Sequence, residues 1–387
     1  MTTSLLITLC TILLLAYVFD LTAGKTKVPS VILLLLLGFV VRQITALFNL
    51  PTPDLQVLLP LFGTVGLILI VLEGSLELEF NRSKTPLIKQ SLLVSLLPML
   101  ALAILLSFVF KAYAEVSFKV ALTNAIPLCI ISSAIAIPSV KSLSPFTKEF
   151  VIYESSLSDI LGVLLFNFVS LHQSFGLSTF GHFGWQLLII GLVSVLATLL
   201  LSVLLNRIEH HVKFVPIIVL VILIYALCKL YHLPGLVFIL LFGLFLGNLH
   251  ELKHFTWIQA LKPDKLGKEV QKFKELSTEA AFLVRALFFL LFGYLMQAPE
   301  LLNPYTLPWS FGIVAAILAL RWLTLKLSGL PLSPLLFIAP RGLITILLFL
   351  SIDSAQRLSF VNTSLILQVI LLSALLMMVG LMKLKRE

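Results

Sequence analysis

The sequence predicts an all-α polytopic membrane protein with about thirteen transmembrane helices. Of its 387 residues, 59% are hydrophobic and only 12% are charged, whereas soluble domains average about 25% charged residues. The mean hydropathy is +1.11. Apolar runs of the roughly 20 residues needed to cross a bilayer core recur along the whole chain. We therefore expect residues 1–387 to form a single transmembrane domain.

Thirteen apolar segments carry this prediction. They are 4–22, 29–48, 57–76, 86–110, 119–140, 149–171, 184–205, 213–230, 234–249, 278–297, 307–327, 332–352 and 362–382. The first lacks the basic start and the small-residue cleavage site of a signal peptide, so we interpret it as a retained span. The two segments on either side of YHLPG, 213–230 and 234–249, are short for membrane spans.

The distribution of Lys and Arg predicts the orientation. Loops after odd-numbered spans, with the C-terminal tail, hold eighteen of these residues, and even-numbered loops hold five. We expect the N-terminus outside and the C-terminus in the cytoplasm, in a bacterial-type inner (cell) membrane. The net charge of +9 then suits acidic membrane lipid, and no nucleic-acid partner is expected.

One long basic connection, residues 250–279, follows the ninth span. Its Lys, Phe and Trp residues suit either a helix along the cytoplasmic interface or a solvated linker. After the last span only MKLKRE remains, so no C-terminal regulatory domain is expected. The three cysteines, Cys10, Cys129 and Cys228, lack disulfide or metal spacing and are expected to be small buried residues.

Ionisable residues inside spans are the candidate functional residues, because each costs at least about 2.5–3.5 kcal/mol at bilayer depth. They are Glu73, Glu154, Asp159, Arg285, Arg321 and Arg341. Arg285 is expected to reach the cytoplasmic interface along its aliphatic stem. Glu73, near a span end, is either an interfacial residue or a residue at the rim of an ion route.

The stretch YESSLSDILGV, residues 153–163, is the most polar part of any span. At about 100° per residue, Ser158 lies roughly 40°, Ser155 roughly 100° and Asp159 roughly 140° from Glu154. The four side chains therefore share one arc, with the two carboxylates on its flanks. One carboxylate can be paired while the other stays free.

Two spans contain helix-breaking features. Pro127 and Pro138 bracket the SSAIA stretch with Ser132 and Ser133, and Pro340-Arg341-Gly342 interrupts a span near the C-terminus. Broken helices at bilayer depth line cavities, and two of them in corresponding halves indicate an inverted-repeat transporter with crossed discontinuous helices. The alternative for the first is a proline kink whose serines bond back to the backbone. A buried Arg needs an anion, and we favour a pair of Glu154 with Arg341, with Arg321 as second choice.

These residues resemble a known family. ESSLSD is similar to the Glu-Ser-x-x-Asn-Asp motif of monovalent cation:proton antiporters of the sodium/proton exchanger type. PRGLITILLF and LALRWLT resemble the family's Arg-bearing helices, and VLEGSLELEF resembles the end of its third span. SSAIAIPSV is similar to the broken helix of the potassium-efflux branch. The resemblance spans most of the chain in order, and it implies an inverted-repeat antiporter fold and a homodimer.

The resemblance also implies roles for the polar residues. Asp159 would bind the cation (Na⁺, K⁺ or Li⁺) or the proton, Glu154 would be a structural acid paired with an Arg helix, and Ser132 and Ser133 would lie in the broken helix. The chain departs from the motif at Ser158, where the exchangers have Asn and the electrogenic branch has Asp, which leaves selectivity and stoichiometry open. Together with Asp159, the candidate ligands of the ion or proton are Ser158, Ser155, Ser132, Ser133 and Glu73.

The chemistry of these side chains points to a transporter. Hard cations take oxygen ligands, and desolvation favours the neutral form of a carboxyl group, so one buried carboxylate can hold a proton or a cation in turn. No cofactor is expected. A sodium-coupled organic anion transporter is the alternative function. An enzyme is not expected, because no His-Glu cluster, Gly-x-Ser-x-Gly or intramembrane Ser-His pair is present, and a TVGYG filter, typical of some channels, is absent too.

Overall fold

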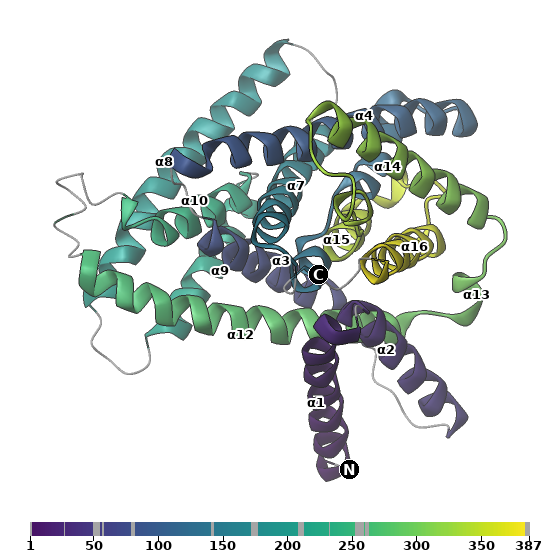
Figure 1. Ribbon diagram of the computed structural model, residues 1–387, viewed down its shortest axis with the longest axis horizontal. Coiled ribbons are helices and arrows are strands. Elements are labelled where there is room, and N and C mark those ends of the chain that lie inside the picture. Colours follow the sequence, from purple (N-terminus) through teal and green to yellow (C-terminus); the bar gives the residue numbers. More distant parts are fainter. Residues whose placement is uncertain are drawn as a thin grey trace. The chain divides into compact units, whose positions relative to one another are not determined.

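A computed structural model shows the chain as an assembly of helices (Figure 1). It describes residues 2–383 except 27, 49–54, 56–57, 79–81, 141–142, 172–176, 208–212, 232, 252–258 and 260–262. No strand occurs in the described residues. The α-helices are α1 (Thr2–Thr26), α2 (Ser30–Leu47), α3 (Leu58–Glu77), α4 (Thr85–Ala114), α5 (Phe118–Ala125), α6 (Ser133–Ser139), α7 (Pro145–Leu171), α8 (Leu177–Arg207), α9 (Phe214–Leu230), α10 (Gly235–Gly247), α12 (Pro263–Leu295), α13 (Ala298–Leu301), α14 (Leu307–Leu327), α15 (Leu343–Ser351) and α16 (Thr363–Met382). Short 3₁₀ helices are η1 (Arg82–Lys84), η2 (Ile126–Cys129), η4 (Leu335–Phe337) and η5 (Ser354–Gln356).

The all-helical membrane fold is confirmed. Within the described residues, eight helical segments are long and apolar enough to cross a membrane, and α9, α10 and the apolar part of α1 are shorter apolar helices. Each of the thirteen predicted segments coincides with helical structure. α7 is not one of the eight long apolar segments, and it carries Lys148, Glu149, Glu154 and Asp159.

The chain forms two compact units. The first contains residues 1–64, 90–162 and 283–387, and the second contains residues 65–89 and 163–282. In the first, α14 packs on α16 and η4, α15 packs on η2 and α16, and α1 packs on α2 and α6. In the second, α8 packs on α10 and α9. All the buried charged residues described below lie in the first unit.

Small residues let helices approach closely inside the second unit. A Cβ atom on Gly247 of α10 would lie 2.8 Å from the backbone oxygen of Leu76 on α3. The neighbouring Asn248 side chain donates to the oxygen of Leu78 at 2.8 Å and is buried. Close backbone contact at small residues is typical of packing between membrane helices.

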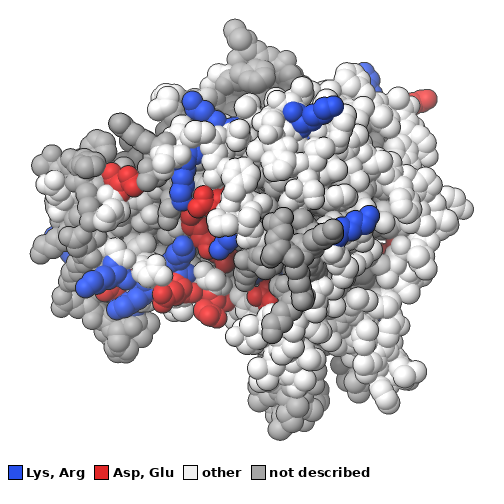
Figure 2. Space-filling model, viewed as in Figure 1, with Lys and Arg blue, Asp and Glu red and all other residues white. Residues whose placement is uncertain are grey.

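Part of the basic connection 250–279 belongs to a longer helix. Residues 263–279, predicted as an interfacial helix or a solvated linker, form the first half of the continuous helix α12, while residues 252–258 and 260–262 lie outside the described part. Leu266, Val270, Phe273 and Ser277 are buried on one face, which is the spacing of an amphipathic helix. Figure 2 shows Lys, Arg, Asp and Glu side chains gathered over this first half, on a molecular face that is otherwise largely uncharged. The apolar face and the tertiary packing make this stretch helical.

Candidate functional site

The first predicted broken helix is interrupted at its centre. α5 ends at Ala125, the 3₁₀ turn η2 follows, and Ile130 is extended before α6 begins at Ser133. Pro127 lies in the first turn of η2, where its missing N–H and fixed φ stop the α-helical hydrogen-bond ladder. Ile130 and Ile131 are buried, so the backbone groups released by the break need partners within the protein.

The second broken helix crosses the first. The turn η4 ends at Phe337, and α15 begins only at Leu343. The Ser132 N–H donates to the Pro340 oxygen at 2.8 Å, which ties the two interrupted stretches together. A Cβ on Gly342 would lie 2.7 Å from Ser132 Oγ and from Ile135 Cδ1, so any other residue here would force these side chains to shift.

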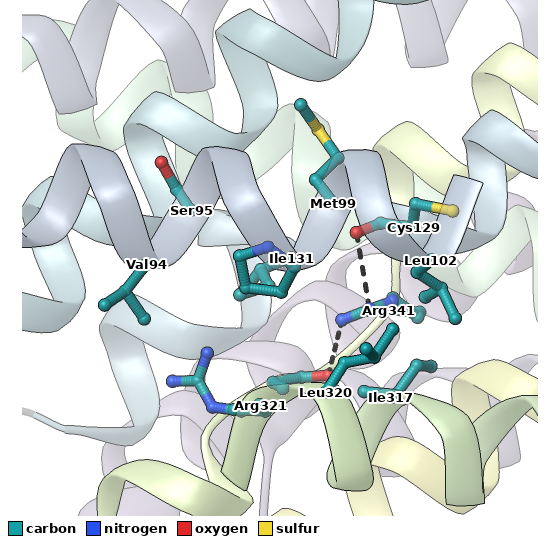
Figure 3. A pocket seen from close by; sticks show the side chains of 12 residues that line it. Val94, Ser95, Met99, Leu102, Cys129, Ile131, Ile317, Leu320, Arg321 and Arg341 are labelled. Atoms are coloured by element: carbon teal, nitrogen blue, oxygen red, sulfur yellow. Dashed lines mark hydrogen bonds between the residues drawn. The ribbon is translucent and has the colours of Figure 1, made fainter. Parts of the chain in front are cut away.

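Arg341 reinforces the crossing. Its Nε donates to Leu128 O at 2.8 Å, its Nη2 to Cys129 O at 3.3 Å and its Nη1 to Ala339 O at 2.9 Å. The guanidinium is buried and satisfies carbonyl oxygens on both interrupted stretches. Figure 3 shows the bond between Arg341 and Cys129 as a dashed line.

α7 covers the first break with two of its polar side chains. Ser158 Oγ accepts a 2.9 Å hydrogen bond from the Ile131 N–H, one of the backbone donors that the break releases. Asp159 Oδ2 accepts from the Ser133 N–H at 3.3 Å and from the Ser133 hydroxyl. The structure therefore brings Asp159, Ser158 and Ser133 together at the point where the helix is interrupted.

These hydrogen bonds use only one of the two carboxylate oxygens of Asp159. It is 2% exposed, and within the described residues its Oδ1 has no hydrogen-bond partner. The hydroxyl of Ser132, next in the chain to Ser133, also has none there. Unpartnered polar atoms are rare in protein interiors and call for an explanation such as an ion or a catalytic role.

The preferred partner of Glu154 in the sequence-based prediction was wrong. Glu154 Oε1 and Oε2 accept from Arg321 Nη1 and Nη2 at 2.5 and 2.9 Å, not from Arg341. Arg321 on α14 has its Nε bonded to Leu335 O at 2.7 Å. Arg341 instead donates to backbone oxygens beside the two helix breaks.

The remaining candidate residues are Ser155, Glu73 and Arg285. Ser155 Oγ donates to Val151 O at 2.6 Å, one turn back on α7. Glu73 is half-buried on α3 in the second unit, and its role in an ion route stays a prediction. Arg285 is half-buried on α12. Cys129 and Cys228 are buried as expected, but Cys10 is exposed.

Sequence reasoning missed Asn124. Its side chain is fully buried and donates to Val120 O at 2.8 Å and to Gln356 O at 2.7 Å, while its Oδ1 accepts from the Leu358 N–H at 3.1 Å. It thereby fastens α5 to the segment that follows α15. The signal was an amide in the apolar stretch ALTNAIP, just before the helix break.

No group of three or more His, Cys, Asp and Glu that could hold a metal ion occurs in the part of the chain that the structure describes. A site at Asp159 would therefore rest on one carboxylate with hydroxyl and carbonyl oxygens. Such a donor set suits a monovalent cation better than a divalent cation, which usually takes more charged ligands.

Comparisons with known proteins point to the class of transporter that the sequence predicts. A model of the family described as "Sodium/hydrogen exchanger, transmembrane" matches residues 10–382. A structure of the sodium proton antiporter MjNhaP1 from Methanocaldococcus jannaschii at pH 8 has a TM-score of 0.68 and 19% identity, covering 98% of this chain and 97% of that one. A second MjNhaP1 structure, from an electron-microscopy map, has a TM-score of 0.70 and 18% identity, covering 100% of both chains.

A comparison with curated proteins gave no significant match. The likeness to the MjNhaP1 structures establishes a common fold, and the family match covers nearly the whole chain, including both broken helices and α7. The predicted resemblance is thus confirmed. The chain is an integral membrane protein that belongs to the sodium/hydrogen exchanger family of cation/proton antiporters.

Proposed function

We propose that this protein exchanges Na⁺ (or K⁺ or Li⁺) for H⁺ by alternating access, with Asp159 as the carboxylate that binds the cation or the proton. One observation carries the proposal. Asp159 is buried at the helix break, one of its oxygens is held by Ser133, and the other has no hydrogen-bond partner within the described residues. An unpartnered buried carboxylate oxygen is suited to a transported ion.

The competition between cation and proton follows from desolvation. A buried anionic carboxylate is unfavourable, and either a proton or a bound cation removes the excess charge. Oxygen ligands for a hard cation would come from Asp159 Oδ1, the unpartnered hydroxyl of Ser132 and carbonyl oxygens near the break. One carboxylate then serves one ion at a time.

Glu154 and Asp159 have separate roles in this proposal. The bidentate bonds to Arg321 neutralise Glu154 and hold α7 to α14, which leaves Asp159 as the exchanging group. Ser158 is better suited to holding the broken helix than to binding the ion, since its oxygen accepts the Ile131 N–H. Glu73 and Ser155 remain weaker candidates for ion ligands.

Coupling requires that the occupied forms change access more readily than the empty, charged form. Relative motion of helical bundles around a midplane site is the usual way in which access alternates. The Lys and Arg bias supports an N-terminus outside and a cytoplasmic C-terminus in a bacterial-type cell membrane, and we further propose a homodimer.

The alternative, sodium-coupled uptake of an organic anion, would use Arg341 to bind substrate. The cavity beside it measures about 20 Å³. That volume exceeds the roughly 10–15 Å³ needed by one water but is too small for an organic anion. The geometry therefore favours antiport.

Antiport can be tested in vesicles that contain the purified protein and an acid-inside pH gradient reported by a quenched dye. Adding Na⁺, K⁺ or Li⁺ should dequench the dye with wild type and with Ser202→Ala, whose hydroxyl donates to Thr198 O at 2.7 Å within α8. Asp159→Asn should show no dequenching while keeping the wild-type gel-filtration profile. Normal dequenching by Asp159→Asn would remove Asp159 from the mechanism.

A further inference from the structure

A small cavity lies inside the first unit, between the two buried arginines. It is bounded by α4, α14 and the two interrupted stretches, and its volume is about 20 Å³. Figure 3 shows Arg321 and Arg341 at this cavity, with Met99 and Leu102 of α4 and Ile317 and Leu320 of α14 around it. The lining is mainly apolar apart from the two guanidinium groups, Ser95 and Cys129.

The charges around the cavity do not balance. Glu154 neutralises Arg321 through a bidentate pair. Arg341 donates only to neutral backbone oxygens, and no carboxylate of the described residues forms an ion pair with it. Two guanidinium groups therefore line the cavity while one carboxylate is ion-paired beside it, so the cavity is a place of positive potential, and a buried charge outside an ion pair is unfavourable.

Unused hydrogen-bond donors accompany this charge. A guanidinium has five N–H groups. Among the described residues, Arg321 and Arg341 each donate three hydrogen bonds, which leaves two N–H groups of each without an acceptor there. The two side chains together can therefore supply both charge and donors to an occupant.

We propose that this cavity binds a small monovalent anion of the halide class, with chloride as the ordinary occupant. A halide accepts hydrogen bonds without a fixed direction. It is also compatible with the apolar side chains that make up most of the cavity wall. It supplies a negative charge next to Arg341, which forms no ion pair within the described residues. The competing occupant is a single water, for which the volume is also sufficient.

Bromide provides a direct test because its anomalous scattering distinguishes it from water. Crystals of the wild-type protein in sodium bromide should give an anomalous peak inside the cavity, between Arg321 and Arg341. Density without an anomalous signal would mean that water alone occupies the cavity, and this result would overturn the proposal. The test does not depend on transport, so it stands or falls separately from the proposed antiport.

Thermal unfolding in detergent provides the second arm. At constant Na⁺ concentration, replacing gluconate by chloride or bromide should raise the Tm of the wild-type protein in a saturable manner, as expected when a ligand binds the folded state. Ser95→Leu, which places a larger side chain in the cavity, should abolish this rise. Leu92→Phe, on the exposed side of the same helix, should retain it.

The outcomes separate binding from general salt effects. A rise that does not saturate, or an equal rise in Ser95→Leu, would contradict a halide site, because salts that act through surface exclusion do not depend on one cavity. If Ser95→Leu fails to fold, Leu320→Phe fills the cavity from α14 instead, and the bromide map of the wild type decides by itself.

Discussion

The buried pair between Glu154 and Arg321 can be tested by a double-mutant cycle. The two side chains are 1% and 2% exposed and share two hydrogen bonds of 2.5 and 2.9 Å. Glu154→Leu would leave the Arg321 charge buried with only Leu335 O as an acceptor, and Arg321→Met would leave a bare carboxylate. Removing one partner of a buried pair costs about 3–5 kcal/mol.

The double variant should be much less destabilised than the sum of the two single changes. Replacing both partners of a buried pair by apolar residues is often close to neutral, but Leu335 O loses its donor, which costs about 1–3 kcal/mol. We therefore expect a coupling energy of at least about 2 kcal/mol, roughly a thirtyfold change in the unfolding equilibrium at 1.4 kcal/mol per factor of ten. The measurement is the unfolding midpoint of the four proteins in mixed detergent.

A second double-mutant cycle distinguishes the Glu154–Arg321 pair from the Glu154–Arg341 pair that the sequence favoured. In Glu154→Leu combined with Arg341→Met, the coupling energy should be smaller than in the cycle with Arg321, since Arg341 donates to backbone oxygens rather than to Glu154. A larger coupling energy for Glu154 with Arg341 than with Arg321 would refute the pairing. So would additive effects in the Glu154–Arg321 cycle.

Two further predictions concern the helix breaks. Ser158→Ala should lower the free energy of unfolding by about 1–3 kcal/mol, because the buried Ile131 N–H loses its acceptor. The control Ser158→Thr keeps a hydroxyl and should retain most of the stability. An unchanged unfolding midpoint in Ser158→Ala would contradict this role. Gly342→Ala should slow antiport in vesicles and lower the Tm, since the new Cβ would lie 2.7 Å from Ser132 Oγ. The control Gly312→Ala on α14 should leave the antiport rate and the Tm unchanged, because a Cβ there would meet no neighbouring atom within 4 Å. Equal activity of the two alanine variants would show that the crossing tolerates a side chain.

The sequence by itself determined the class of fold and singled out the residues of the candidate site. Long apolar segments predicted membrane helices, because the bilayer leaves few ways of satisfying the backbone. The rarity of carboxylates in such segments singled out Glu154 and Asp159, and the prolines near Ser132 and Ser133 marked one break. The Pro340-Arg341-Gly342 stretch marked the other.

The tertiary structure decided which residues meet. Helical periodicity shows that Glu154 and Asp159 point in different directions, but it does not say which of two buried arginines reaches Glu154. The pairing depends on the packing of α14 against the rest of the unit and on the carbonyl oxygens that hold Arg341. The boundary of α12 was likewise decided by packing, since its charged first half looks like a linker when hydropathy alone is considered.

The role of Ser158 illustrates the difference most clearly. In the sequence it is an oxygen-bearing side chain beside a carboxylate, and it was therefore counted among the ion ligands. In the folded chain its oxygen accepts the Ile131 N–H, a donor that exists only because a helix 27 residues away along the chain is broken at this point. A residue's local chemistry can be read from the sequence, but its partner depends on which distant backbone groups the fold leaves unsatisfied.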